Sequence, residues 1–394
     1  MNTKKNALLG AIFLMATSAI GPGFLTQTAN FTQKMGAAFA FAILISILID
    51  IAVQLNVWRV IGATRMRAQE LGNTLVPGLG WVLAVLIAIG GLVFNIGNIA
   101  GGGLGLNALL GLDAKWGGVI TAVIAIIFFA SARLGVALDK LLVVLGVLMM
   151  LLTLYVCVVA HPPVGDALKN TVLPEKVDGV VITTLVGGTV GGYITYAGAH
   201  KMLDSGETDL KAISRSSVTG ILLTGVMRVL LFLAVLGVVA GGVSLAEASN
   251  PAGAAFESAA GTIGLRFFGV VLWAASLSSV IGASYTSASF LTKTNATKTV
   301  QNAITIVFIL ISCAVFFFNG TAPKNLLIFA GAFNGLVLPI GFSIIIFIAL
   351  FRPRGLLRDR PYPKWLIAIG FIALIVAWFL AYKSFGGVFN LLKG

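Results

Sequence analysis

The chain has 394 residues, of which 58% are hydrophobic and only 10% are charged, and its formal net charge is +13. A mean hydropathy of +1.03 excludes an ordinary soluble protein and indicates a polytopic membrane protein. The basic residues fall in short loops between apolar segments, where they orient a membrane protein, so no nucleic-acid partner is expected. Cys157 and Cys313 lie in apolar segments, so no disulfide framework is expected, and nothing in the sequence indicates the oligomeric state.

Eleven apolar segments are long enough to cross a bilayer: residues 7–29, 36–58, 79–110, 117–132, 141–160, 179–200, 212–241, 262–291, 301–318, 325–350 and 363–385. With the N-terminus inside, most Lys and Arg residues fall in interior loops. We therefore predict an integral protein of a prokaryotic cytoplasmic membrane, in contact with the lipid bilayer, with the N-terminus inside and the C-terminus outside. The polar segment 64–74 is predicted to be a short cytoplasmic connector, and the exterior loops 162–178 and 242–261 to hold short gate helices.

The first span is interrupted by Gly21–Thr28, which reads Gly-Pro-Gly-Phe-Leu-Thr-Gln-Thr. Pro22 has no N–H to donate and crowds the preceding turn, so the backbone there is expected to be free. At membrane depth, free backbone is tolerated only where protein buries it or where it lines a cavity, which predicts a binding site. A similar stretch at residues 192–195, Gly-Tyr-Ile-Thr, interrupts the sixth span. Interrupted spans in corresponding places of two halves are typical of secondary transporters.

Two other groups of residues bear on packing. Gly101–Gly103, with Gly105, are interpreted as a close-packing surface of the third span. Asn334, before Pro339 in the tenth span, predicts either a partly unwound helix or a hydrogen bond between helices.

Ten of the spans form two groups of five, each opening with a broken helix, so the second group is inverted relative to the first. This pattern resembles the leucine-transporter fold, which implies an all-α membrane protein with about eleven transmembrane helices and with helices 1 and 6 broken. We predict a single membrane transport domain over residues 1–394. Its first repeat is placed at 7–160, its second repeat at 179–350 and an additional span at 363–385.

Four spans carry a more detailed resemblance to the NRAMP (natural resistance-associated macrophage protein) metal transporters and their relatives. The family's first-span Asp-Pro-Gly-Asn corresponds to Gly-Pro-Gly-Phe at 21–24, and its sixth-span Met-Pro-His-Asn to Gly-Gly-Tyr-Ile at 191–194. Its third-span acidic pair corresponds to Asn95 and Asn98, and its eighth-span Ala-Ala-Gly-Gln-Ser-Ser is similar to Ala-Ala-Ser-Leu-Ser-Ser at 274–279. The resemblance implies a proton-coupled divalent metal transporter.

The residues at these positions do not match that chemistry. Gly21, Phe24 and Gly191 occupy the places that the resemblance assigns to the metal, and none of them can ligate. A thioether and a carboxylate suit a transition metal, and Mg²⁺ normally takes at least one carboxylate. Asn95 and Asn98 cannot titrate. No metal site is therefore predicted, and a Mg²⁺ or Mn²⁺ transporter stays the alternative function that the family implies.

The predicted function is ion-coupled transport of a small carboxylate-bearing organic solute, such as an amino acid or 5-oxoproline. Free backbone N–H groups and helix N-termini suit an anionic group. The predicted substrate-binding residues are Gly21, Gly23, Phe24, Thr26, Gln27, Asn95, Asn98, Gly191, Gly192, Tyr193 and Tyr196. An enzyme is not expected, because no nucleophile and base pair or metal set is placed at membrane depth.

No cofactor is expected beyond Na⁺ or H⁺ as the coupling ion. In sodium-coupled members of the fold, hydroxyls of the eighth span and carbonyls at the first break hold Na⁺. The resemblance therefore implies Ser278 and Ser279, together with the carbonyls near Ala19 and Ile20. Such an oxygen-only site suits a hard cation. The alternative is that these serines pack and hydrogen-bond within the helix.

Three ionisable residues are candidates for proton coupling or for structural roles. Asp50 lies inside the second span, where a charge is costly, and acts either as a coupling or gating acid or as a structural partner of Arg228. Arg228 lies deep in the seventh span and could also attract a substrate anion. His200 is a candidate proton shuttle, because it follows the broken sixth span, although a span end also fits the water interface.

Overall fold

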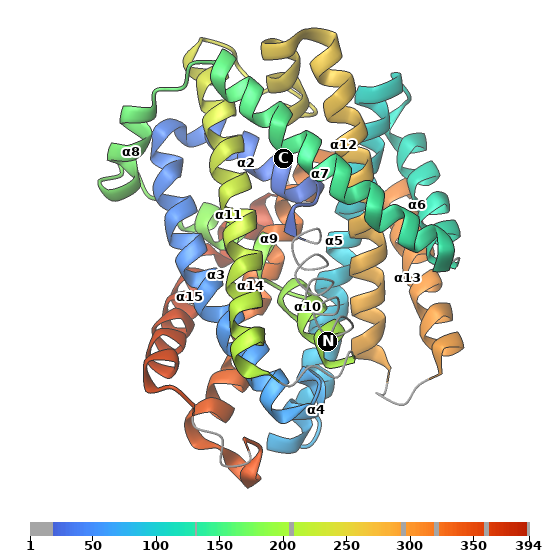
Figure 1. Ribbon diagram of the computed structural model, residues 1–394, viewed down its shortest axis with the longest axis vertical. Coiled ribbons are helices and arrows are strands. Elements are labelled where there is room, and N and C mark those ends of the chain that lie inside the picture. The colour runs from blue at the N-terminus through green and yellow to red at the C-terminus, as the bar shows by residue number, and fades with distance from the viewer. Residues whose placement is uncertain are drawn as a thin grey trace.

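The computed structural model describes residues 19–130, 132–204, 209–292, 297–318, 323–357 and 362–391, and this part of the chain is helical without strands. The helices lie side by side in an elongated bundle, with α7 crossing one face obliquely (Figure 1). Their bounds are α2 Pro22–Met35, α3 Phe39–Thr64, α4 Ala68–Leu75, α5 Leu79–Leu110, α6 Ala114–Ala130, α7 Ala132–Val159, α8 Val164–Val172, α9 Gly179–Thr189, α10 Ile194–Asp204, α11 Leu210–Ala240, α12 Pro251–Leu291, α13 Lys298–Phe318, α14 Pro323–Phe351 and α15 Lys364–Asn390. Short 3₁₀ turns occupy Gly36–Ala38 and Pro353–Gly355.

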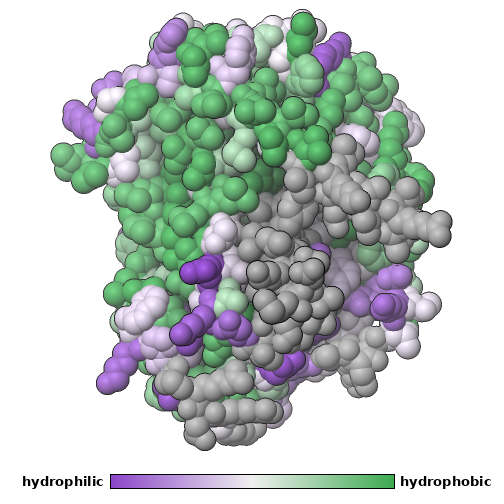
Figure 2. All heavy atoms as spheres, viewed as in Figure 1, coloured by the Kyte–Doolittle hydropathy of each residue, from purple (hydrophilic) through white to green (hydrophobic). Residues whose placement is uncertain are grey.

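Each predicted span corresponds to one or two of these helices, although residues 7–18 of the first span lie outside the described part. Eight described segments are long and apolar enough to cross a membrane, the first of them running from Pro22 to Thr64. The shorter apolar helix α6 and the bent pair α7 and α8 account for the fourth and fifth spans. Hydrophobic side chains form a broad band on the face shown in Figure 2, with hydrophilic ones towards both ends. The chain is an integral membrane protein.

The first break is shorter than the sequence predicts. Within the described residues only Ile20 and Gly21 depart from the helix, and α2 begins at Pro22 and continues past Thr28. The expectation of free backbone over the whole of Gly21–Thr28 is therefore wrong. Proline suits the first position of a helix because its missing N–H would have no partner there anyway.

The second break agrees with the prediction. Helix α9 ends at Thr189, and α10 begins at Ile194, so four residues separate the two halves of the sixth span. Gly192 has a φ of 53°, in the left-handed region that glycine adopts without the steric cost of a Cβ. The sixth span is therefore a broken helix.

Both long loops contain the predicted helical segments, and the connector is helical as well. Helix α4 follows the second span, and α8 continues from α7 after a bend of 107°. The loop before the eighth span contains the first part of α12, which is separated from the rest by a kink at Gly261, with a φ of 63°. The gating role of these segments stays a prediction.

Helix α5 is the central packing element, with α6, α12 and α14 against it (Figure 1). Its glycines allow this close approach. A Cβ added at Gly101 would lie 2.2 Å from the Pro22 side chain, and one at Gly103 would lie 2.0 Å from the carbonyl oxygen of Ala114. Gly105 meets the backbone of Trp273 in the same way. These glycines form the predicted close-packing surface.

A polar contact joins the far ends of the two broken spans. Asp178 caps α9 by accepting hydrogen bonds from the N–H groups of Val180 and Val181, and Lys34 near the end of α2 donates to its carboxylate at 2.7 Å. Partial burial raises the pKa of Asp178, but the hydrogen bond and charge of Lys34 and the two N–H groups outweigh burial and lower this pKa below its ordinary value.

We expect Gly103→Ala to lower the melting temperature of the purified protein. The added methyl group meets backbone rather than a movable side chain, and such overpacking costs about 1–3 kcal/mol. Gly146→Ala on α7 is the control, because no atom lies within 4 Å of its added Cβ. Equal melting temperatures for the two variants would contradict the close packing of α5 and α6.

We also expect Asp178→Asn to lower the melting temperature at neutral pH. The amide still caps α9 but no longer pairs with Lys34. Because the folded pKa is lowered, the wild-type carboxylate stabilises the protein above its unfolded pKa of about 3.9 and loses that contribution as the pH falls through the folded value. The difference between the two proteins should therefore shrink in acid. Glu257→Gln, at an exposed position on α12, is the control and should show no such difference.

Candidate functional site

The first break lies between α5 and α12. A Cβ added at Gly21 would lie 2.7 Å from Ser279 Oγ and 3.7 Å from Asn98 Oδ1. Gly23, two residues further, lies near the carbonyl oxygen of Leu327 on α14. Three neighbouring helices therefore surround the start of α2 with polar atoms as well as apolar ones.

Asn98 connects the first break to the second. Its side chain approaches the hydroxyl group of Tyr193, the last residue of the second break. Apart from this mutual approach, neither the Tyr193 hydroxyl nor Asn98 Nδ2 has a hydrogen-bond partner among the described residues, although both are buried. Phe94 packs edge-on against the Tyr193 ring, with centroids 5.5 Å apart. The structure thus brings Gly21, Asn98 and Tyr193 together and leaves two buried donors available for a ligand.

The space beside the glycines of the second break is occupied mainly by atoms of α14. A Cβ at Gly192 would lie 1.7 Å from Asn334 Oδ1, and one at Gly191 would lie 2.9 Å from the Asn334 carbonyl oxygen. Asn334 Nδ2 donates to the carbonyl oxygen of Gly90 on α5 at 3.0 Å, and α14 is helical through this position. Asn334 therefore makes the hydrogen bond between helices, and the prediction of a partly unwound helix there is wrong.

The Gln27 side chain likewise occupies the space beside two glycines. Its Nε2 donates to the carbonyl oxygen of Leu327 at 3.0 Å, and its side chain lies against Gly188 on α9 and Gly331 on α14. Its Oε1 has no partner within the described part of the chain. Thr26 beside it is buried. Gln27 thus joins α2, α9 and α14 next to the breaks.

Asn95 lies apart from these residues. Its Nδ2 donates to Ser284 Oγ at 2.9 Å and to Ser312 Oγ at 3.1 Å, so it bonds to α12 and α13. The structure does not bring Asn95 together with either helix break, unlike Asn98 one turn along.

Tyr196 and His200 line the other side of α10. Tyr196 packs edge-on against Phe290 at 5.3 Å, and His200 Nδ1 lies 3.1 Å from Ser289 Oγ. His200 is buried, so the prediction that it lies at the water interface is wrong. The reason is that α12 covers this face of α10. The Tyr196 hydroxyl group lies towards Gly341, so Tyr196 packs against α12 and α14.

The two serines predicted to hold a cation point in different directions. Ser279 is buried and faces Gly21, whereas Ser278 is half-exposed. The sequence prediction missed Ser276, which is buried and lies close to Gly101 beside Pro22. Residues three apart share a helix face, so the spacing of 276 and 279 predicts that these two serines face the first break together.

A cluster of two buried ionisable residues, Asp50 and Arg228, lies next to the two breaks. The guanidinium group of Arg228 stands 4.3 Å from the centroid of the Phe24 ring, and its Nη1 donates to Thr189 Oγ1 at 3.0 Å. Asp50 on α3 lies beside the same threonine. Sequence analysis had identified Asp50 and Arg228 but not Thr189, which directly precedes the second break.

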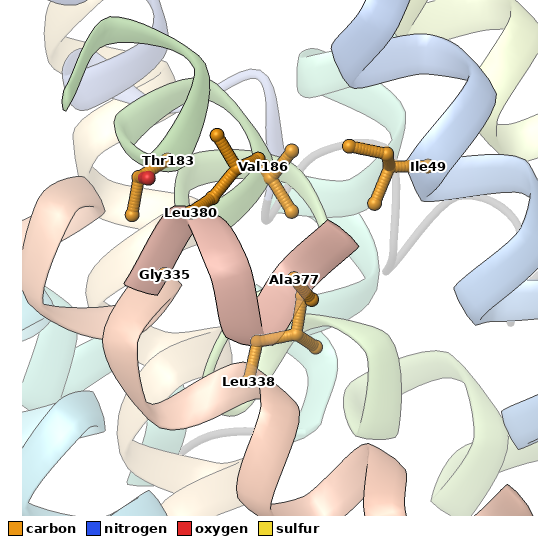
Figure 3. A pocket seen from close by; sticks show the side chains of 7 residues that line it. All are labelled: Ile49, Thr183, Val186, Gly335, Leu338, Ala377 and Leu380. Atoms are coloured by element: carbon orange, nitrogen blue, oxygen red, sulfur yellow. The ribbon is translucent and has the colours of Figure 1, made fainter. Parts of the chain in front are cut away.

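The pocket in Figure 3 is not part of this site. It is a small hollow of about 10 Å³ between α3, α9, α14 and α15, lined mainly by apolar side chains such as Ile49, Val186 and Leu338. Its lining offers only one hydroxyl group, that of Thr183. It therefore lacks the polar groups that would orient a solute.

The donor atoms at the two breaks are backbone groups, amides and hydroxyls. Gly21, Phe24 and Gly191 offer no ligating side chain. Throughout the described ranges, no three His, Cys, Asp or Glu side chains gather as a metal would require. The site is therefore equipped to donate and accept hydrogen bonds.

The sequence is similar to known membrane proteins over almost its whole length. The family model described as natural resistance-associated macrophage protein-like (Nramp) matches residues 12–385. The uncharacterized membrane protein YcsG of Bacillus subtilis is 48% identical over 374 residues, covering 94% of this chain and 91% of that protein. An uncharacterized membrane protein of Haemophilus influenzae is 48% identical over 385 residues, covering 97% and 96%.

Solved structures show the fold. A manganese transporter of Eremococcus coleocola, in complex with an aromatic bis-isothiourea substituted compound, has a TM-score of 0.74 at 16% identity, covering 97% of this chain and 86% of that chain. MhsT in complex with L-phenylalanine has a TM-score of 0.65 at 18% identity, covering 98% of both chains. The architecture is the leucine-transporter fold. By sequence, this chain belongs to the natural resistance-associated macrophage protein-like family.

Proposed function

We propose that this Nramp-family protein is a secondary active transporter of a small organic solute that carries a carboxylate, such as an amino acid or 5-oxoproline. The observation that carries the proposal is a pair of buried donors, the Tyr193 hydroxyl and Asn98 Nδ2, which lie beside each other between two helix breaks that lack ligating side chains and have no other partner among the described residues. A buried polar group without a partner costs free energy, so it favours a ligand that can accept its hydrogen bond.

The start of α2 supports a carboxylate in particular. The first N–H groups of a helix have no intrahelical partner and carry partial positive charge, so they attract anions. Gly23 and Phe24 occupy this first turn. MhsT, which has a similar fold, was solved with L-phenylalanine, so this architecture is known to hold a solute with a carboxylate.

Divalent metal transport is the second candidate, because the chain belongs to the Nramp family and its fold is similar to that of a manganese transporter. Mn²⁺ or Mg²⁺ would have to be held by backbone carbonyls, Asn98 and hydroxyl groups, without a carboxylate at either break. This donor set is weaker for either ion than one with an acidic ligand.

The proposal places the protein in a prokaryotic cytoplasmic membrane, with the N-terminus inside and the C-terminus outside. Its partners are the solute, the lipid bilayer and a coupling ion, which is Na⁺ or H⁺. A sodium site would use Ser279 and the backbone near Ala19 and Ile20. A proton site would use a buried ionisable residue such as Asp50.

Uptake by reconstituted proteoliposomes tests the proposal. We expect radiolabelled amino acids or 5-oxoproline to accumulate against a gradient, and Mn²⁺ and Mg²⁺ not to accumulate. Replacing Na⁺ by choline separates the two coupling ions, because only a sodium-coupled carrier would then lose uptake. Saturable uptake of Mn²⁺ or Mg²⁺, with no uptake of any acid, would reject the organic-solute proposal in favour of the second candidate.

We expect Tyr193→Phe to raise the KM for the transported acid about tenfold, because a donor to the substrate is worth roughly 1.5 kcal/mol. The melting temperature should not fall, since the lost hydroxyl has no partner among the described residues. Tyr362→Phe is the matched control. Its hydroxyl donates to Asn56 Oδ1 at 2.8 Å, so that variant should lose stability but keep its KM. An unchanged KM in Tyr193→Phe would remove Tyr193 from the site.

A further inference from the structure

We propose that Asp50, Thr189 and Arg228 form a proton-controlled carboxylate site, in which protonation of Asp50 frees Arg228 to bind the carboxylate of the solute. The inference rests on the proposed function and adds to it the coupling ion, which is H⁺, and the residue that holds the charge of the solute. The resemblance to metal transporters assigns no role to these three residues.

Arg228 is a buried cation with unused donors. It is 2% exposed, and its guanidinium group has one hydrogen bond, from Nη1 to Thr189 Oγ1. Nε and Nη2 have no partner among the residues that the structure describes. An arginine keeps its charge in proteins and offers a planar fork of N–H groups that matches a carboxylate. Contact with the Phe24 ring compensates only part of the cost of burying that charge.

Asp50 does not supply the missing anion in this conformation. It is 1% exposed, and no oxygen of its carboxyl group lies within 4.0 Å of an Arg228 nitrogen. Both oxygens lack a hydrogen-bond partner within the described part of the chain. An ionised carboxylate buried without donors is strongly disfavoured, whereas the neutral acid is tolerated.

Thr189 explains why Asp50 finds no donor. The threonine hydroxyl donates to the carbonyl oxygen of Leu185 at 2.9 Å and accepts from Arg228. In this geometry its proton points to Leu185 within α9, so Thr189 Oγ1 faces Asp50 as an acceptor. A protonated Asp50 fits this environment because its O–H can donate towards Thr189 Oγ1.

Few other charges face Asp50. Arg228 on α11 is the charged group that acts on it, and Thr189 on α9 is the polar one. Helix α9 carries no titratable side chain. Lys34 of α2 is bonded to Asp178 beyond the far end of α9, and His200 of α10 is bonded to Ser289. Arg228 is therefore the charged group that mainly determines whether Asp50 is ionised.

The cluster adjoins the proposed solute site. Thr189 is the last residue of α9 before the second break, and Phe24 lies in the first turn of α2 after the first break. A solute carboxylate near the start of α2 could therefore reach the free N–H groups of Arg228 once the Phe24 ring moves aside.

The charges balance over a transport cycle. With Asp50 neutral, Arg228 pairs with the solute carboxylate, so one proton and one carboxylate enter the site together. When the solute leaves, Asp50 releases its proton and becomes the counter-ion of Arg228. Arg228 then has an anion beside it both when the solute is bound and when Asp50 is ionised, and a buried cation without one is costly at membrane depth.

Binding of radiolabelled 5-oxoproline, L-alanine and L-phenylalanine to the purified full-length protein, measured across a pH series, tests the site. The wild-type affinity for the bound acid should fall as the pH rises, by up to about tenfold per pH unit once Asp50 ionises. Asp50→Asn mimics the protonated acid, so its affinity should match the low-pH wild-type value and stay constant with pH. Arg228→Gln should bind at least about tenfold more weakly at every pH.

Controls separate these effects from loss of the fold. Ser46→Ala lies one turn from Asp50 on α3, and the Ser46 hydroxyl donates to the carbonyl oxygen of Ile43 in the same helix, so this variant should keep the wild-type pH dependence. Arg228→Lys retains the charge without the planar fork and should bind more weakly than wild type but more tightly than Arg228→Gln. All variants are compared only after their melting temperatures show that they are folded.

The outcomes distinguish this inference from the proposed function. If the wild-type protein binds none of the acids, the proposed function fails, and this site fails with it. If it binds an acid but Asp50→Asn keeps the wild-type pH dependence, or Arg228→Gln keeps the wild-type affinity, the proton-controlled site alone is rejected. In that case Arg228 merely stabilises the C-terminal end of α9, as a cation does at a helix C-terminus.

Discussion

The requirement that backbone polar groups be satisfied inside the membrane determines how this protein is built. A helix satisfies its own groups, and a helix that stops midway leaves N–H and C=O groups that protein or ligand has to satisfy. Here two spans stop midway, at Ile20–Gly21 and at Val190–Tyr193. Helices α5, α12 and α14 pack around both breaks and supply Asn98, Ser279 and Asn334. The rest of the bundle holds these three helices in place.

The glycines near the breaks allow neighbouring side chains to pack closely and do not leave an open cavity. Asn334 occupies the volume beside Gly192, and Gln27 occupies the volume beside Gly188. Their amide groups bond to backbone carbonyls of neighbouring helices. The site available to a solute is therefore smaller than a glycine-lined cavity would be. It is defined by the few donors that remain unpaired, which makes hydrogen-bond geometry the natural basis of selectivity.

The sequence predicts the architecture well because hydropathy, span length and helix breakers report directly on membrane helices. It predicts the site less well, because it does not specify which neighbour each side chain faces. Asn95 and Asn98 are one turn apart, yet Asn95 bonds to Ser284 and Ser312, and Asn98 faces Gly21. Ser278 was chosen with Ser279 from a linear motif, although adjacent residues on a helix point about 100° apart. His200 was placed at a span end, where sequence alone does not show that α12 covers it.

The spacing of the buried charges is harder to explain by stability than by function. A purely structural ion pair between Asp50 and Arg228 would bring carboxylate and guanidinium into direct contact, since only good geometry offsets the cost of burying both. Thr189 instead lies between them and directs its own proton to Leu185. Helices α3 and α11 thus hold an acid and a base near each other without a direct ion pair between them. This is the arrangement that the proposed proton-controlled site requires, and it lies at the end of α9, directly before the second break.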